Sequence, residues 1–225
     1  MIPPAELKRI AVRRFSIAAL VLGAVFFVSA GTLRYWEAWV YLVALFTPMT
    51  LVVGYLIKHD PSLLARRLTV REERAKQSAI QKLGSVFWLL MFVIPGLDQR
   101  FAWSGVNPLL VAVSDVFVLS GYLLFFLVMR ENSYASRIIE VQEGQTVITT
   151  GPYALVRHPM YLAVLVMLFF SPLALGSFWA LIPTVFTPIM LVLRIRDEEA
   201  MLMAELPGYR AYTQQTPYRL IPGVW

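Results

Sequence analysis

Six long apolar segments constrain the fold of this chain more than any other feature of its sequence. They cover, approximately, residues 15–33, 36–57, 84–97, 108–129, 160–175 and 178–193. A membrane-spanning helix needs about 20 mostly apolar residues, and most of these segments reach or approach that length. Only Gly176 and Ser177 separate the last two segments, which predicts a helical hairpin. The pattern therefore predicts an all-α integral membrane protein with about six transmembrane helices.

The composition indicates that lipid is the solvent for most of the chain. Hydrophobic residues make up 58% of the 225 residues and charged residues only 15%, whereas ordinary soluble domains have about 45–50% and about 25%. This balance excludes a soluble globular domain, a disordered chain and a nucleic-acid-binding protein of the usual polar, basic kind. The sequence contains no cysteine, so it offers neither disulfides nor a thiolate metal site.

The basic residues are distributed unevenly around the apolar segments. Lys and Arg concentrate before the first segment, between the second and third, between the fourth and fifth, and after the sixth, whereas only Arg34 and Arg100 fall in the other connections. Because cytoplasmic loops carry an excess of Lys and Arg, this predicts six spans with both termini in the cytoplasm. The net charge of +6 is then a consequence of membrane topology.

A polar stretch at residues 61–82 separates the second and third apolar segments. Its mixture of leucines with basic residues predicts a helix that lies in the cytoplasmic interface with its apolar side towards the membrane. The alternative is a solvated linker helix whose basic residues only satisfy the charge rule for cytoplasmic loops. We expect residues 1–130 to form an N-terminal transmembrane region that includes this helix. Residues 131–225 then form a second region with the helical hairpin, 159–193, and a cytoplasmic tail.

One concentration of polar residues precedes the fifth apolar segment. Residues 145–150 have the β-branched composition of a strand, and Gly151-Pro152 interrupts them with a proline suited to the first turn of a helix. Pro159 disfavours the α conformation at His158 and should itself begin the fifth span. The positive end of a helix would then lie at the cytoplasmic mouth of the membrane region, where it favours an anion.

A second concentration follows the sixth segment and contains Arg194, Glu198 and Glu199. Arg194 and Glu198 share a helix face, but an Arg that precedes its Glu is the weaker order for helix stabilisation. The predicted hairpin would return these residues to the neighbourhood of residues 157–161, which predicts one site at one membrane surface. The alternative is that these residues have only structural roles. His158 would then cap a backbone group, and Glu198 and Glu199 would be a solvated acidic pair outside the bilayer. Asp115, inside a span, is expected to reach the outer interface without a function.

Together, these two stretches resemble the integral-membrane methyltransferase family that includes isoprenylcysteine carboxyl methyltransferase and phosphatidylethanolamine N-methyltransferase-like proteins. The combination of G-P-Y-x-x-x-R-H-P-x-Y with a downstream Glu pair is specific, although each piece alone is weak. The resemblance covers roughly the last ninety residues, and the earlier segments match only in hydrophobicity. The resembling residues are Gln145 to Tyr153, Arg157 to Tyr161, Arg194, Glu198, Glu199, Tyr209 to Tyr212 and Arg219 to Pro222.

The resemblance implies a cytoplasmic pocket for S-adenosylmethionine, with S-adenosylhomocysteine as product, and an amphipathic or lipidic methyl acceptor that resembles either an isoprenylcysteine carboxylate or a phospholipid amine. It implies Arg194, near the acceptor, and Glu198 as catalytic residues. Family members often have His where this chain has Gln145. The implied cofactor contacts are Gln145, Thr146, Val147, Ile148, Tyr153, Arg157, His158, Pro159, Met160, Tyr161, Glu198 and Glu199.

Two other functions stay open at this point. A membrane reductase that uses NADPH would share a similar C-terminal architecture, but the sequence has no G-x-G-x-x-G and little Arg clustering for a 2′-phosphate. A non-enzymatic membrane scaffold would require both polar concentrations to be incidental.

Overall fold

The computed structural model describes residues 3–69, 75–135 and 140–225, which form helices and connecting loops with no strand among them. The expected all-α class is therefore confirmed for these ranges. The elements are α1 (Pro4–Ala30), α2 (Trp36–His59), α3 (Pro61–Thr69), α4 (Ala75–Phe101), α5 (Pro108–Glu131), η1 (Gly151–Ala154), α6 (Pro159–Ala174), α7 (Leu181–Thr184), α8 (Phe186–Glu205) and α9 (Tyr209–Gln215).

Three helices are long and apolar enough to cross a membrane when the described residues are judged by length and composition. They are Ala5–Ala30 within α1, Trp36–His59 and Pro108–Glu131. Helix α6 is apolar but shorter, and the third predicted segment lies within α4. The structure thus supports three of the six expected spans, and the other three stay predictions.

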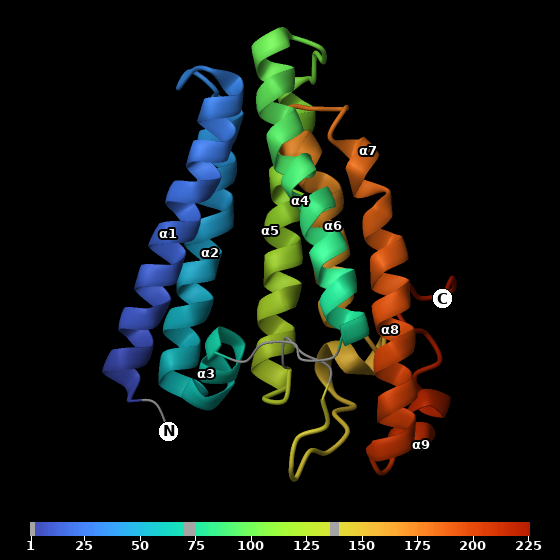
Figure 1. Ribbon diagram of the computed structural model, residues 1–225. Coiled ribbons are helices and arrows are strands. Elements are labelled where there is room, and N and C mark those ends of the chain that lie inside the picture. Colours follow the sequence, from blue (N-terminus) through green and yellow to red (C-terminus); the bar gives the residue numbers. More distant parts are fainter. Residues whose placement is uncertain (1–2, 70–74, 136–139) are drawn as a thin grey trace.

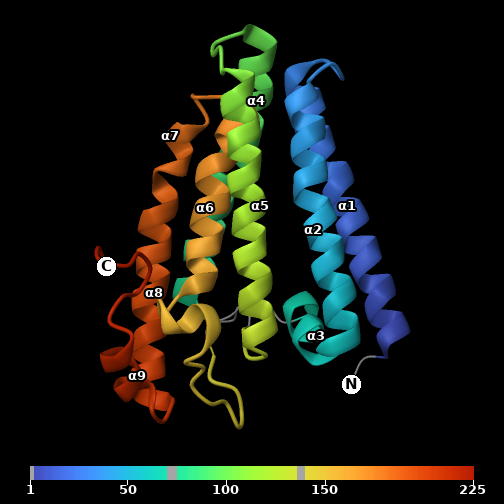
Figure 2. The ribbon, with the colours of Figure 1, turned by 180° about the vertical axis from the view of Figure 1, so that it is seen from behind.

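The long helices run roughly side by side. Helices α1 and α2 lie at one side, α5 lies centrally beside α4 and α6, and α8 lies at the other side (Figures 1 and 2). Gly121 lets α5 approach α6 closely, because a Cβ at this position would lie 2.6 Å from Met167 Cγ and 3.0 Å from the Ala163 carbonyl oxygen. Gly96 does the same for α4 and α1, since its Cβ would lie 1.8 Å from Ser29 Oγ.

The apolar core of the described residues divides into three clusters. In one, the ring of Phe26 from α1 packs against Tyr41 of α2 and Phe92 of α4 at centroid distances of 6.0 and 5.7 Å. A second cluster joins α1, α2, α3 and α5. A third joins the end of α8 to α9. The last two clusters lie towards the end of the bundle that carries α3 and α9 (Figure 1).

Helix α3 differs from the interfacial helix expected over residues 61–82. Its leucines, Leu63, Leu64 and Leu68, are 0%, 3% and 8% exposed, because they pack inside the protein in the cluster that also contains Leu7 and Leu56. The apolar side of α3 therefore faces α1 and α2 rather than lipid. The remainder of the predicted helix falls on residues 70–74, which lie outside the described ranges, and on the beginning of α4.

The chain reverses direction after α6 through a longer connection than the two-residue turn expected from the sequence. Gly176 takes a positive φ of 71°, the short α7 follows, and α8 begins only at Phe186. Asp98 anchors the reversal to α4, because its carboxylate accepts hydrogen bonds from the hydroxyls of Ser104 and Ser177. Helices α6 and α8 consequently run in opposite directions with their polar ends at the same end of the molecule (Figure 1).

Candidate functional site

A pocket lies at the end of the bundle that carries α3 and α9, between the loop at residues 140–150, the start of α6 and the end of α8. We call it the α6–α8 pocket; it is an open pocket whose empty space of about 810 Å³ includes open solvent. The expected site residues that line it are Gln145, Thr146, Val147, Ile148, Tyr153, Arg157, His158, Pro159, Met160, Tyr161 and Glu198.

The start of α6 has the local structure that the sequence predicts. His158 is in a non-helical conformation (φ −123°, ψ 60°) and Pro159 is the first residue of α6. Two backbone hydrogen bonds fix this entry to the C-terminal tail, since the amides of Arg157 and His158 donate to the carbonyls of Tyr218 and Arg219, each at 2.9 Å. The imidazole of His158 is thereby held at the pocket wall with only 5% of the residue exposed.

The loop that forms the opposite wall is not the strand that its composition suggested. Residues 145–149 have no regular secondary structure, because the loop forms its own local hydrogen bonds instead of pairing with another strand. The side-chain oxygen of Gln145 accepts from the backbone amide of Gln142 at 2.9 Å, and the side-chain amide of Gln142 donates to the carbonyl of Tyr134 at 3.0 Å. Gln145 therefore stabilises the loop as well as lining the pocket.

A three-residue hydrogen-bond network joins α6 to α8 beside the pocket. The hydroxyl of Tyr161 donates to Glu198 Oε2 and accepts from Arg194 Nε at 2.8 Å. Arg194 and Glu198 share a face of α8, as the sequence predicts, but Tyr161 bridges them. Glu198 lines the pocket, whereas Arg194 lies behind Tyr161 and is not among the pocket-lining residues.

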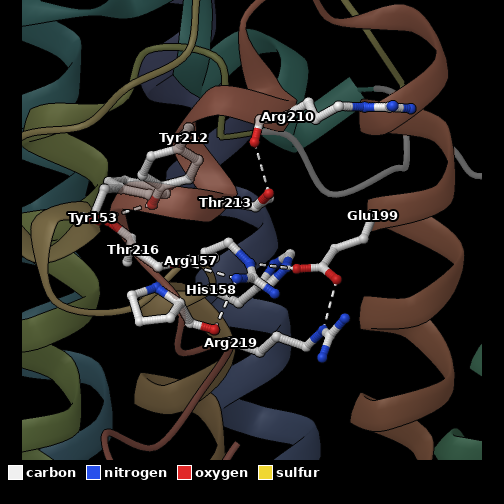
Figure 3. Close-up of polar contacts among 10 residues, drawn as sticks. Tyr153, Arg157, His158, Glu199, Arg210, Tyr212, Thr213, Thr216 and Arg219 are labelled. Atoms are coloured by element: carbon white, nitrogen blue, oxygen red, sulfur yellow. Dashed lines mark hydrogen bonds and ion pairs between the residues drawn. The ribbon is translucent and has the colours of Figure 1, made fainter.

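The neighbouring acid, Glu199, belongs to a different, buried cluster (Figure 3). Its Oε1 accepts from Arg157 Nε at 2.7 Å and lies 3.3 Å from His158 Nε2, and its Oε2 accepts from Arg219 Nε at 2.6 Å. Burial opposes ionisation of this carboxyl, but the hydrogen bonds from His158, Arg157 and Arg219 outweigh burial and lower its pKa to about 2. Glu199 is therefore ionised at neutral pH and lies outside the pocket lining.

Arg157 also faces the tail rather than the interior of the pocket. Besides its ion pair with Glu199, its Nη1 donates to the carbonyls of Thr216 and Pro217 at 2.9 Å each. Only 7% of Arg157 is exposed, and its guanidinium connects the residue before α6 to α8 and to the tail through these hydrogen bonds. The sequence did not predict this geometry, because it depends on a turn that brings residues 216–219 back across the start of α6.

A further set of hydrogen bonds closes the pocket from the side of α9. The Tyr212 hydroxyl donates to the carbonyl of Tyr153 at 2.7 Å, and Asn132 Nδ2 donates to the hydroxyl of Tyr153 at 2.7 Å. Burial raises the pKa of Tyr212 to about 12, so its hydroxyl stays protonated at neutral pH. These contacts join the end of α5, η1 and α9 around the pocket.

Sequence reasoning missed part of the lining. Asn132, at the end of α5, carried no recognisable signal. Met201 and Leu202 form an apolar wall of the pocket, and their spacing could have revealed it, because they lie three and four residues after Glu198 and so share its helix face. The pocket is also lined by Tyr134, Ala135, Glu140, Leu206, Tyr209 and Tyr212.

Tyr209 adds a buried polar group next to the pocket. The residue lines the pocket and is 4% exposed, and its hydroxyl has no hydrogen-bond partner within the described part of the chain. A buried hydroxyl without a partner costs about 1–3 kcal/mol. The described residues contain no group of three or more His, Asp or Glu that could hold a metal ion.

Part of the chain that contains the pocket matches the model of a known protein family. Residues 111–204 match the model of the isoprenylcysteine carboxyl methyltransferase family, so the resemblance predicted from the sequence is confirmed over that segment. The match extends from α5 to the end of α8 and therefore includes most of the pocket, but it ends before α9 and the tail. Comparison with curated proteins found no match.

Proposed function

We propose that the chain is a membrane methyltransferase that transfers a methyl group from S-adenosylmethionine to an amphipathic or lipidic acceptor. One observation carries the proposal: His158, Tyr161 and Glu198, from two stretches some forty residues apart, share one pocket within the segment that matches the family. We further propose that this pocket is the cofactor site and that it faces the cytoplasm, as the distribution of basic residues predicts.

The lining suits the chemical groups of the cofactor. When bound, S-adenosylmethionine supplies an activated methyl group on a sulfonium cation. The carboxylate of Glu198 would attract a cationic part of the ligand, and the start of α6 with His158 would hold a carboxylate. Leu202, Met201 and Val147 provide an apolar surface for an adenine ring, beside the unpartnered hydroxyl of Tyr209.

Arg157 and Glu199 take a positioning role in this proposal. Their ion pair lies behind His158 and holds the entry of α6 against the tail. Methyl transfer depends largely on positioning the two reactants and excluding water. A rigid entry to α6 would therefore contribute to catalysis without contact between these two side chains and the reacting groups.

A second cavity supports an acceptor with an apolar chain. It lies between α4, α6 and α8, is open to its surroundings with about 940 Å³ of empty space that includes open solvent, and is lined mostly by apolar side chains. We call it the α4–α8 groove. Val164 in its wall lies one helical turn after Tyr161, and Met190 lies one turn before Arg194. An apolar chain in this groove would therefore place its head group near the Tyr161–Arg194–Glu198 network.

Calorimetric titration of the purified protein with S-adenosylhomocysteine tests the cofactor site. We expect binding that falls at least about tenfold in Glu198→Gln and His158→Ala. Glu205→Gln is the matched control, because Glu205 is an exposed acid on the same helix and does not line the pocket. Equal binding by folded Glu198→Gln, His158→Ala and Glu205→Gln variants would overturn the assignment of the site.

The acceptor is tested with a radiolabelled methyl donor and separate lipid fractions that contain prenylated cysteine carboxylates or phospholipid amines. Transfer of label to either fraction identifies the acceptor class. A thermal-shift comparison with NADPH addresses the reductase alternative, and stronger stabilisation by NADPH than by S-adenosylhomocysteine would contradict our proposal. A protein that binds neither nucleotide and labels no lipid would instead support the scaffold alternative.

A further inference from the structure

The last residues of the chain, 218–225, fold into a compact turn whose backbone amides are largely paired within the turn itself. The carbonyl oxygen of Trp225 accepts hydrogen bonds from the amides of residues 219–221 at 2.9, 2.9 and 3.2 Å. The amides of Val224 and Trp225 donate to the carbonyl of Ile221, each at 3.1 Å. Unsatisfied backbone groups are costly where water is scarce, so this pairing lowers the cost of placing the turn against lipid.

The turn presents an apolar surface to its surroundings. Leu220 is 4% exposed and packs inwards, whereas Tyr218, Ile221 and Val224 are 38%, 40% and 76% exposed. We call these three side chains the tail surface. The sequence has no charged residue between positions 220 and 225.

The charge nearest to the tail surface belongs to Arg219, and it is directed towards the protein. Its Nε donates to Glu199 Oε2 at 2.6 Å (Figure 3), and its guanidinium lies over the ring of Trp225 at 5.4 Å from the centroid. The ion pair with Glu199 neutralises this guanidinium. The turn can therefore contact an apolar environment without burying an unpaired Arg219.

The position of the turn in the molecule points to lipid as that environment. The C-terminus lies on the outer side of α8, at the periphery of the bundle, and higher in both views than the lower ends of α2 and α5 (Figures 1 and 2). Helices α2 and α5 are long and apolar enough to cross a membrane. The turn therefore lies beside the bundle at a depth that these two helices also occupy.

We propose that the tail surface is a membrane anchor that inserts into the lipid interface beside α8. Tyrosine and tryptophan beside aliphatic side chains are typical of segments that lie at the boundary between lipid and water. The depth of the turn favours lipid over a soluble protein as the partner. The anchor stands whether or not the α6–α8 pocket binds S-adenosylmethionine.

The anchor would connect the membrane with the wall of the α6–α8 pocket. The carbonyls of Tyr218 and Arg219 accept the hydrogen bonds from the amides of Arg157 and His158, and His158 lines the pocket. Lipid contact at Tyr218 and Ile221 would therefore hold the segment that positions the start of α6.

Site-specific fluorescence in lipid nanodiscs tests the anchor. Because the chain has no cysteine, the dye nitrobenzoxadiazole can be attached at one introduced cysteine, in Val224→Cys. Gln214→Cys is the matched control, since Gln214 is exposed on α9 at the polar end of the bundle. Leu119→Cys is the lipid reference, because Leu119 is exposed on α5. Phosphatidylcholine with a nitroxide on its acyl chain quenches dye in lipid, and iodide quenches dye in water.

We expect the dye at position 224 to behave like the dye at position 119. Burial of a side chain the size of valine favours the lipid-facing position by about tenfold, so the ratio of lipid quenching to iodide quenching should be about tenfold higher at 224 than at 214. A ratio at 224 equal to that at 214 would overturn the proposal by placing the turn in water. Protection of position 224 from both quenchers would also overturn it, because another protein surface would then cover the turn.

A second labelling position keeps the test independent of one variant. Ile221→Cys labels another side chain of the tail surface and should give the same quenching ratio as Val224→Cys. Thermal unfolding of each labelled protein establishes that it is folded. If both labelled positions are folded and both are quenched by iodide as strongly as position 214, the tail surface is no anchor.

Discussion

The hydroxyl of Tyr161 donates a hydrogen bond to the carboxylate of Glu198, and so connects the first turn of α6 with the polar part of α8. The same oxygen accepts a hydrogen bond from Arg194. One phenol therefore binds both the carboxylate that lines the α6–α8 pocket and Arg194, which lies one helical turn after Met190 of the α4–α8 groove. The network thus lies within one helical turn of residues that line the groove.

Replacement of Tyr161 by Phe tests this connection. The ring remains, but Glu198 and Arg194 lose their common partner, so we expect the affinity for S-adenosylhomocysteine to fall about tenfold and stability to fall by roughly 1–2 kcal/mol. Calorimetry and thermal unfolding measure the two effects. Tyr218→Phe is the control, since Tyr218 is 38% exposed and does not line the pocket. Wild-type affinity in Tyr161→Phe would show that the hydrogen bonds do not position Glu198.

The pKa of Glu199 predicts a specific loss of stability in acid. Because folding lowers this pKa from 4.5 to about 2, its stabilisation is fully present above about pH 4.5 and is lost as the pH falls towards 2. At 1.36 kcal/mol per pKa unit, it amounts to roughly 3 kcal/mol. Glu199→Gln should therefore be less stable than wild type at pH 7 but should show a smaller further loss between pH 5 and 3. Parallel pH profiles for wild type and Glu199→Gln would contradict this prediction.

Tyr209 and Tyr212 are expected to respond in opposite ways to the same substitution. Tyr209→Phe removes a buried hydroxyl that has no partner among the described residues, so the ligand-free protein should be as stable as wild type or slightly more stable. Tyr212→Phe removes a hydroxyl that donates to Tyr153, which should cost about 1 kcal/mol. Thermal unfolding without ligand distinguishes the two variants. If a ligand uses the Tyr209 hydroxyl, Tyr209→Phe should also bind S-adenosylhomocysteine more weakly.

The contact between α5 and α6 predicts a large effect from a small side chain. Gly121→Val would force its side chain against the Ala163 carbonyl, which is backbone and cannot move alone. We expect a loss of about 1–3 kcal/mol and weaker ligand binding, since α6 carries Pro159 and Tyr161 into the pocket. Gly54→Val is the control, because a Cβ at Gly54 would meet nothing within 4 Å. Equal melting temperatures for the two variants would show that the helices can separate without cost.

The sequence predicted local features of the site better than their relative positions. Pro159 fixes its own backbone and restricts His158, so the non-helical entry to α6 followed from two adjacent residues. The return of α8 also followed, because the apolar segments required a reversal between them. The different surroundings of Glu198 and Glu199 could not be predicted. The C-terminal tail brings Arg219 to Glu199, whereas Glu198 accepts a hydrogen bond from Tyr161.

Composition was a poorer guide where tertiary contacts decide the outcome. The leucines of α3 suit a membrane surface as well as a protein interior, and only packing against α1 and α2 places Leu63 inside. The β-branched residues at 145–150 favour a strand, but the described ranges offer no neighbouring strand to pair with. The partners that satisfy the amphipathic preference of α3 lie far away in the chain, whereas the extended preference of residues 145–150 finds no strand partner within the described ranges.

The backbone bonds from Arg157 and His158 to the tail also set an order for assembly of the protein. The start of α6, which carries His158 to the pocket wall, is not held in place until residues 218 and 219 have been synthesised and have folded back across it. A nascent chain with all its long helices already inserted therefore still lacks a finished pocket. Ligand affinity should for that reason depend on correct folding of the entire C-terminal third. Incorrect membrane insertion of α6 or α8 would abolish ligand binding even where the preceding helices are correctly inserted.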